Sequence, residues 1–236
     1  MLSSYKAVFF DAGGTLFRPF PSVGEIYQKV AAKYGCKAEA GTLESLFRQT
    51  WVRHDGLAEL ASHCNEKVEK DWWKKMVHEV FSQAGGVSDF EAFFDELYDT
   101  FAEVSCWQLF PDALEVLTEL KRRKKRIAII SNWDSRLFKI CEGFGIHTHV
   151  EFILASAVFG AAKPSPRIFE EALRRTKVSA AEAVHIGDSF EDDIRGARAV
   201  GMSAIWINQY PLKGDTVHPL AQTTPTIRQL KDLILS

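Results

Sequence analysis

The second half of the chain alternates between short apolar runs and amphipathic stretches, and this alternation restricts the possible folds more than any other feature. Four apolar runs follow Pro111, at 126–131 (RIAIIS), 152–155, 183–187 and 202–207. The stretches between these runs, at 112–123, 136–144, 166–175 and 191–200, have helical spacing. Continuous apolar runs are typical of parallel strands that are buried on both faces. With an initial run at 5–10 (YKAVFF), they predict five strands in a Rossmann-like, doubly wound parallel α/β sheet.

A long helical segment interrupts this pattern directly after the first strand. Ser22 is a suitable N-cap for a helix that extends to about residue 34. Further helices are expected from residue 42, over 65–84 and over 89–101. We therefore expect an α/β core built from residues 1–17 and 108–236, with residues 18–107 inserted as an α-helical cap.

Composition and charge exclude several classes of protein. The 29 basic and 31 acidic residues give a net charge of −2, which leaves no basic excess for general binding to nucleic acid. The apolar runs are far shorter than the roughly 20 residues of a membrane span, and the N-terminal apolar run is too short for a signal peptide. The four cysteines are scattered without a CxxC spacing, which disfavours a zinc site. We expect a soluble cytoplasmic protein that binds neither nucleic acid nor membrane.

Four polar side chains stand where predicted strands, or the loops after them, end. Asp11 follows the first strand, Ser131 ends the second, Lys163 lies beyond the third and Asp188 follows the fourth. Ligands of open parallel sheets bind at the carboxyl ends of the strands. A single aspartate at a strand end is more often a helix N-cap, but two carboxylates, a hydroxyl and an ammonium group from distant parts of the chain indicate one site.

The segments that carry these residues resemble the motifs of the haloacid dehalogenase-like (HAD) hydrolase superfamily. The segments are FFDAGGTL, IAIISNWD, GAAKPSPRIF and VHIGDSFEDDI, and the resemblance covers essentially the whole chain. The insert after the first strand resembles the subfamily with an α-helical cap, and the aromatic stretches DWWKK and SCWQLFPDA indicate one branch of it. The resemblance implies a hydrolase, most simply a Mg²⁺-dependent phosphatase of a small phosphorylated metabolite.

The resemblance also implies roles for the residues that bind and attack the phosphate. Asp11 would be the nucleophile that forms an aspartyl-phosphate, which water then hydrolyses. Ser131 would donate to a phosphoryl oxygen, and Asn132 would bind substrate beside it. Lys163 would pair with both Asp11 and the phosphate, which limits the repulsion between two anions.

A second set of oxygen ligands would hold the metal ion. The resemblance implies that Asp11, the backbone carbonyl of Gly13 and Asp188 bind Mg²⁺, a hard cation that suits oxygen ligands. Asp193 fits the second acid of a GDxxxxD pattern, in an outer position, and the neighbouring Asp192 competes for that role.

One position departs from the phosphatase pattern. Phosphatases of the superfamily usually carry a second aspartate two residues after the nucleophile as general acid and base, and this chain has Gly13 there. Such a group typically contributes 10²- to 10⁴-fold to the rate. The substrate could have a good leaving group, a cap residue such as His54 or Arg53 could supply the proton, or catalysis could have been lost.

These alternatives leave three functions open. Beside the phosphatase stand a metal-independent dehalogenase-type hydrolase and a non-catalytic protein that binds a phosphate ligand or a partner. Asp188 and Asp193 favour the phosphatase, because a dehalogenase has no need of a cation site. The natural substrate and the oligomeric state are open, with a monomer expected.

Overall fold

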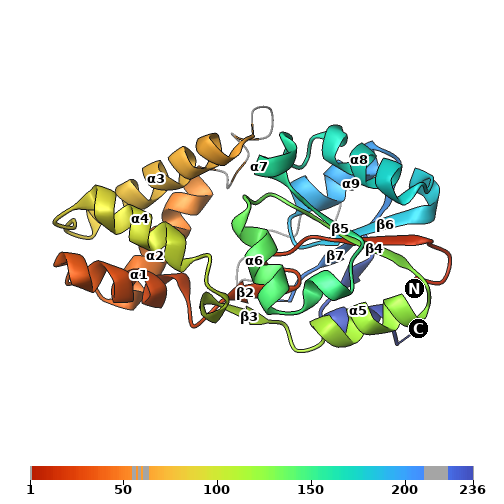
Figure 1. Cartoon of the computed structure of the whole chain (residues 1–236), viewed down its shortest axis with the longest axis horizontal. Helices are drawn as coiled ribbons and strands as arrows, with labels where there is room; N and C mark the ends of the chain where they lie inside the picture. The colour runs from red at the N-terminus through yellow and green to blue at the C-terminus, as the bar shows by residue number, and fades with distance from the viewer. Residues whose placement is uncertain (1, 55–56, 58–59, 61–63, 210–222, 236) are drawn as a thin grey trace.

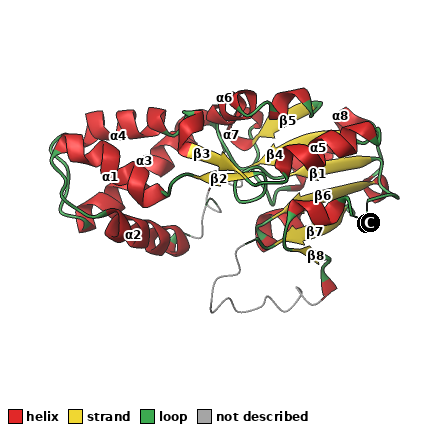
Figure 2. Cartoon of the chain, turned by 90° about the horizontal axis from the view of Figure 1, so that it is seen from below, coloured by secondary structure: helices red, strands yellow, loops and turns green. Residues whose placement is uncertain are grey.

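The computed structural model describes residues 2–54, 57, 60, 64–209 and 223–235, which form a parallel sheet flanked by helices and a separate group of helices (Figures 1 and 2). Every neighbouring pair in the sheet is parallel. The strand order is β5 (Phe152–Ala155), β4 (Arg126–Ser131), β1 (Ala7–Phe10), β6 (Ala183–Gly187), β7 (Ser203–Ile207) and β8 (Thr226–Ile227). The predicted α/β class is confirmed, because β1 lies centrally with strands added on both sides.

The prediction of five strands was wrong by one. The edge strand β8 pairs with β7 through Trp206 and Thr226 and through Ile207 and Ile227. Its two residues form no apolar run in the sequence, so periodicity could not reveal it. Its pairing depends on a partner strand that the tertiary fold brings alongside.

Helices cover both faces of the sheet. Along β1, Val8 and Phe10 pack into one apolar cluster while Ala7 and Phe9 pack into another, as the period-two geometry of a strand requires. The first cluster lies under α5 (Ala113–Arg122), α6 (Arg136–Gly143) and η8 (Leu230–Leu233), and the second under α8 (Pro166–Thr176) and α9 (Gly196–Ala199). All four side chains are fully buried, so the central strand is held rigidly from both sides.

The separate group of helices has its own apolar core. This group of helices, which we call the helical cap, consists of α1 (Val23–Ala31), α2 (Ala40–Arg53), α3 (Glu66–Gln83) and α4 (Phe90–Thr100). All four helices lie inside the segment 18–107 that the sequence marked as helical. The predicted N-cap Ser22 is confirmed, because its Oγ accepts a hydrogen bond of 3.1 Å from the backbone N–H of Glu25. Within the described residues, no helix combines the length and the apolar character that crossing a bilayer demands.

A two-stranded antiparallel ribbon carries the chain into and out of the helical cap. β2 (Phe17–Pro19) pairs with β3 (Trp107–Leu109), with Phe17 opposite Leu109. Figure 2 shows this ribbon between the cap and the parallel sheet. The predicted boundaries at residues 17/18 and 107/108 fall within the ribbon, whose short strands have no recognisable sequence pattern.

The helix expected over 191–200 takes a different form. Phe190–Arg195 forms a π-helical turn, η6, in which the N–H of Ile194 reaches back five residues to the carbonyl of Ser189. The regular helix α9 begins only at Gly196. Such wide turns are frequent at functional sites, and here the turn carries the three acids Glu191, Asp192 and Asp193.

Candidate active site

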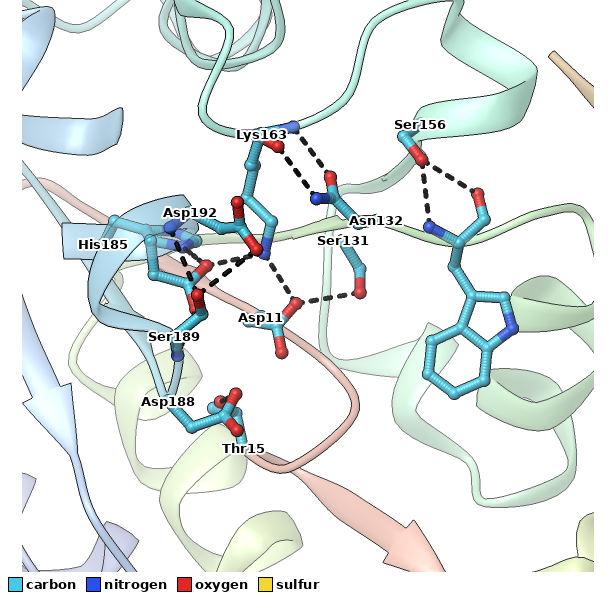
Figure 3. Close-up of polar contacts among 12 residues, drawn as sticks. Asp11, Thr15, Ser131, Asn132, Ser156, Lys163, His185, Asp188, Ser189 and Asp192 are labelled. Carbon is cyan, nitrogen blue, oxygen red and sulfur yellow. Dashed lines mark hydrogen bonds and ion pairs between the residues drawn. The ribbon is translucent and has the colours of Figure 1, made fainter. Parts of the chain in front are cut away.

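Three adjacent strands bring the predicted site residues together. β1 lies between β4 and β6, so Asp11, Ser131 and Asp188, which end these strands or directly follow them, meet at one edge of the sheet. Lys163 reaches the same place from the loop before α8 (Figure 3). Because carboxyl ends of parallel strands share an edge, the topology alone suffices to assemble residues that are up to 177 positions apart in the sequence, the separation of Asp11 and Asp188.

Asp11 is held through one of its two carboxylate oxygens. Its Oδ1 accepts hydrogen bonds from Ser131 Oγ at 2.8 Å and from Lys163 Nζ at 2.7 Å. No described residue donates a hydrogen bond to Oδ2, and Asp11 lines the cavity in front of the sheet. Burial raises the pKa of Asp11, while the charge and hydrogen bond of Lys163 act in the opposite direction. The carboxylate is therefore fixed in orientation with one oxygen directed to the cavity (Figure 3).

Lys163 is buried between two carboxylates. Its Nζ lies 2.7 Å from Asp11 Oδ1 and 2.6 Å from Asp193 Oδ1, and the residue is only 2% exposed. Burial alone would lower the pKa of Lys163, but the charges of both aspartates outweigh it and raise the pKa. The ammonium group thus remains charged at neutral pH.

Asp193 holds the ammonium group of Lys163 in place. Its Oδ1 also lies 2.8 Å from Nε2 of His185, and its Oδ2 accepts a hydrogen bond of 3.0 Å from the backbone N–H of Ser189. Burial would raise the pKa of Asp193, but Lys163 and the hydrogen bond with His185 lower it. Both oxygens of Asp193 are engaged by protein groups, and Asp192 and Asp193 both belong to the residues that line the cavity.

Asn132 holds the backbone of Lys163. Its side-chain oxygen accepts a hydrogen bond of 2.7 Å from the N–H of Lys163, and its Nδ2 donates to the carbonyl of the same residue at 2.9 Å. The sequence assigned Asn132 to substrate binding, and the structure places it at the cavity wall as a clamp on Lys163.

Asp188 faces the cavity on the other side of Asp11. Thr15 Oγ1 donates to Asp188 Oδ1 at 3.4 Å, and the side chain is exposed toward the cavity. Enclosure by the cavity walls, followed by the charges of Asp11 and Asp193, raises the pKa of Asp188 well above its usual value. Gly14 permits this arrangement, because it has a φ of +80° and a Cβ there would lie 2.3 Å from Asp188 Oδ2.

The carboxylates at this edge form a candidate cation site. Oxygens of Asp11, Asp188 and Asp193 lie within 4.8 Å of one another. Gly13, whose carbonyl the resemblance assigned to the metal, lies at the same cavity. Among the described residues, Lys163 is the cation that contacts this group, and it contacts Asp11 and Asp193 but not Asp188. Asp192 adds a fourth carboxylate nearby, whose pKa burial raises to about 6.

The ring of Trp133 occupies the space beside Gly13, which is the residue two positions after Asp11. A Cβ on Gly13 would lie 2.9 Å from Cζ3 of Trp133. The ring of Trp133 is packed against Trp107 at 5.0 Å and against Phe17 at 5.6 Å between centroids, and its backbone N–H donates to Ser156 Oγ. The glycine therefore makes room for Trp133.

The two cap residues considered as proton donors lie elsewhere. His54 Nε2 lies 2.8 Å from Oε2 of Glu79, and Arg53 pairs with the same glutamate. Neither residue lines the cavity that contains Asp11. Because α2 turns both side chains toward α3, the interpretation that they reach the reacting groups is wrong for this structure.

Sequence reasoning missed three residues that shape the site. The His185 ring and the backbone N–H of Ser189 bind Asp193, and the Trp133 ring covers Gly13. A signal for His185 exists in the sequence, because it is the one ionisable residue inside the apolar run 183–187. Ser189 and Trp133 follow strand ends directly, but nothing in the sequence indicates where their groups point.

Comparison with known proteins gives the family of this chain. The family model of the haloacid dehalogenase-like hydrolases matches residues 5–201. Haloacid dehalogenase-like hydrolase domain-containing protein 3 of Bos taurus is 37% identical over 212 residues, which cover 86% of this chain and 81% of that protein. This is the branch of the helical-cap subfamily that the aromatic stretches indicated, and that prediction is confirmed.

More distant relatives include different hydrolases. Phosphoserine phosphatase of Thermus thermophilus is 28% identical over 232 residues, covering 86% of this chain and 89% of that protein. A solved structure of a dehalogenase matches with a TM-score of 0.74 and 22% identity over 99% of this chain and 97% of that chain. At that identity the likeness shows the shared fold, and the site itself must distinguish between the two reactions.

Proposed function

The chain belongs to the haloacid dehalogenase-like hydrolase family, and from this premise we propose that it is a Mg²⁺-dependent phosphatase of a small phosphorylated metabolite that reacts through an aspartyl-phosphate on Asp11. The observation that carries the proposal is the carboxylate of Asp11. One oxygen is held by Ser131 and Lys163, and the other is directed to a cavity beside Asp188.

The chemistry of the donor set fits a divalent cation. Oxygens of three carboxylates converge here, and Lys163, the described cation that contacts them, pairs with Asp11 and Asp193 but not with Asp188. Desolvation, followed by the charges of Asp11 and Asp193, raises the pKa of Asp188. Asp11, Asp188 and the Gly13 carbonyl would hold Mg²⁺, with Asp193 behind them. When bound, Mg²⁺ would neutralise charge shared between the carboxylates and the phosphate.

The protein's own groups prepare the attack on phosphorus. Ser131 and Lys163 bind Oδ1 of Asp11, which leaves Oδ2 as the attacking oxygen. Lys163 also reduces the repulsion between this anion and a phosphate dianion. Asn132, Asp193 and His185 touch none of the reacting atoms in this arrangement; they fix the position of Lys163 through its backbone and its Nζ.

Two other functions explain less of the site. A dehalogenase-type reaction needs no second aspartate at position 13, but it gives no role to the exposed carboxylate of Asp188. A protein that only binds a phosphate ligand has no need of a carboxylate with one oxygen free beside a buried ammonium group, since that carboxylate repels the ligand.

The test measures release of inorganic phosphate from 4-nitrophenyl phosphate and acetyl phosphate with Mg²⁺ and with EDTA. We expect turnover with Mg²⁺ and its loss in EDTA. Asp188→Asn should raise the Mg²⁺ concentration for half-maximal rate at least about 10-fold, whereas Asp95→Asn, a matched change on the surface of α4, should leave it unchanged. Turnover that is insensitive to EDTA, with halide release from a 2-haloacid, would establish the dehalogenase instead.

A further inference from the structure

The cavity in front of Asp11 is large compared with a phosphate group. Its volume is about 690 Å³, and it is enclosed by residues of both the sheet and the helical cap. Asp11, Ser131, Lys163 and Asp188, which lie close together in Figure 3, all line this cavity. A substrate phosphate at Asp11 therefore fills the space beside these residues, and the rest of the substrate occupies the space toward the cap.

That remaining space is walled by aromatic rings. On the cap side, the rings of Phe47 and Trp51 stack with centroids 6.1 Å apart, and Trp51 stacks on Trp73 at 5.8 Å. On the sheet side, Trp107 and Trp133 lie 5.0 Å apart. Aromatic walls favour flat, apolar groups that present a ring face or edge.

Among the described residues that line this cavity, both cations, Lys163 and Arg136, are paired with carboxylates, which leaves neither free for a second anionic group of the substrate. Arg136 lines the cavity, but its guanidinium binds both oxygens of Asp134, at 2.6 Å and 2.9 Å. Its planar face also lies 3.5 Å from the ring centroid of Tyr98. The walls therefore suit a group whose only negative charge is the phosphate.

The part of the cavity beside Asp11 lacks an acid at the position that would protonate the leaving group. Trp133 fills the space next to Gly13, and among the described residues no histidine lines the cavity. The carboxyl groups of Asp192 and Glu69 also line it, but they come from η6 and from α3 of the cap and not from the loop after β1. A leaving oxygen that departs without a proton must be stable as an anion. A phenol has a pKa of about 10, whereas an alkanol is close to water, at about 15.7.

The proposed function and these walls together specify the substrate, and we propose that it is the phosphate monoester of a phenol or similar aromatic hydroxyl compound, with its ring between Trp133 and the cap tryptophans. Oδ2 of Asp11 forms a bond to phosphorus as the bond between phosphorus and the phenolic oxygen breaks. The phenolate leaves with the electron pair and takes a proton from water. A second water then attacks the aspartyl-phosphate, releasing inorganic phosphate and restoring Asp11.

The test compares kcat/KM across esters that separate leaving-group stability from ring binding. Phenyl and 1-naphthyl phosphate carry an aromatic ring, cyclohexyl phosphate carries a saturated ring of similar size, and acetyl phosphate has a good leaving group without a ring. We expect phenyl phosphate to exceed cyclohexyl phosphate at least 100-fold, and both aryl esters to have a lower KM than acetyl phosphate.

A pair of variants tests the aromatic wall. Trp51→Leu should lower the ratio of kcat/KM for 1-naphthyl phosphate to that for acetyl phosphate about 10-fold. Phe138→Leu changes an exposed ring on α6 outside the cavity, and it should leave the ratio unchanged.

The outcomes distinguish this inference from the proposed function. Turnover of acetyl phosphate without preference for aryl esters would overturn the substrate class and leave the phosphatase standing. Turnover of cyclohexyl phosphate as fast as that of phenyl phosphate would also overturn the substrate class. If this turnover is lost in Glu69→Gln, the buried Glu69 of α3, which lines the cavity, is identified as a proton donor. Failure of every ester, acetyl phosphate included, would refute the phosphatase itself.

Discussion

The edge of the sheet and the helical cap each contain a lysine–aspartate ion pair; the distances between the charged atoms are similar, but the two pairs differ in burial. Lys163 and Asp11 lie 2.7 Å apart with side chains 2% and 9% exposed. Lys67 and Asp71 on α3 lie 2.5 Å apart with side chains 84% and 54% exposed. Water screens the second pair, so it contributes little, whereas the first is surrounded by protein and its charges act strongly on every neighbouring group.

The same contrast extends to function. The sheet edge presents a fixed set of charged groups that can react with a phosphate, and the cap presents aromatic rings that can discriminate between substrates. Changes to the groups that hold or attack the phosphate should therefore affect all substrates alike, and changes in the cap should alter the preference among substrates. The following predictions test this division, from the largest expected effect to the smallest.

The largest effect is expected from Asp11→Asn, which removes the attacking carboxylate. We expect kcat to fall at least about 10⁴-fold for aryl and acyl phosphates equally, because losing a nucleophile stops the common step. Rates are measured as phosphate release, and circular dichroism checks the fold. Asp71→Asn in the cap is the matched control. A variant that keeps a tenth of the activity would exclude Asp11 as nucleophile.

Removal of the buried lysine should have the next largest effect. Lys163→Met leaves Asp11 and Asp193 without their cation, so we expect the free energy of unfolding to fall by about 3 kcal/mol and kcat to fall about 10²-fold or more. Urea denaturation at pH 7 in EDTA measures the first quantity. Lys67→Met should not measurably change the urea midpoint; equal effects of the two variants would contradict the comparison.

Glu69 on α3 gives the cap its own buried ionisable group, and it should make stability depend on pH. Burial, and then the charge of Asp134, raises its pKa from 4.5 to about 8. The unfolded chain therefore releases a proton that the folded protein retains, and stability falls as pH rises from about 4.5 to about 8.

Glu69→Gln removes this dependence, because an amide has no proton to lose in this range. The variant should be more stable than the parent by about 2 kcal/mol at pH 6, with the difference vanishing near pH 4. Urea titrations at both pH values measure it, and Glu91→Gln on the surface of α4 is the control. A constant difference at both pH values would show that Glu69 is charged in the folded protein.

The smallest effect is expected where a proton donor is restored. Gly13→Asp alone brings the new side chain against Trp133, so it should lower activity. Combined with Trp133→Ala, the aspartate has room, and we expect turnover of cyclohexyl phosphate to rise about 10-fold over Trp133→Ala alone. The pair Gly13→Asn and Trp133→Ala has the same shape without the acid; an equal gain there would show that space, and not the proton, limits the rate.

Much of the fold could be predicted from local patterns in the sequence. Val8 and Phe10 on one side and Ala7 and Phe9 on the other form an apolar run whose burial on both faces could be predicted, and Ser22 begins α1 as expected. The ribbon of β2 and β3 and the edge strand β8 could not be predicted, because two or three residues carry no periodicity. Their pairing is decided by which segments the larger elements bring together.

The sequence by itself determined the reactive groups: Asp11, Ser131, Lys163 and Asp188 follow from their places at strand ends, because parallel strands must share an edge. Only the tertiary structure decided what surrounds them. It bound Asp193 to Lys163 and His185, turned His54 away toward Glu79, and set Trp133 over Gly13. Backbone topology follows from patterns along the chain, whereas the direction of a side chain depends on packing between segments that the sequence keeps far apart.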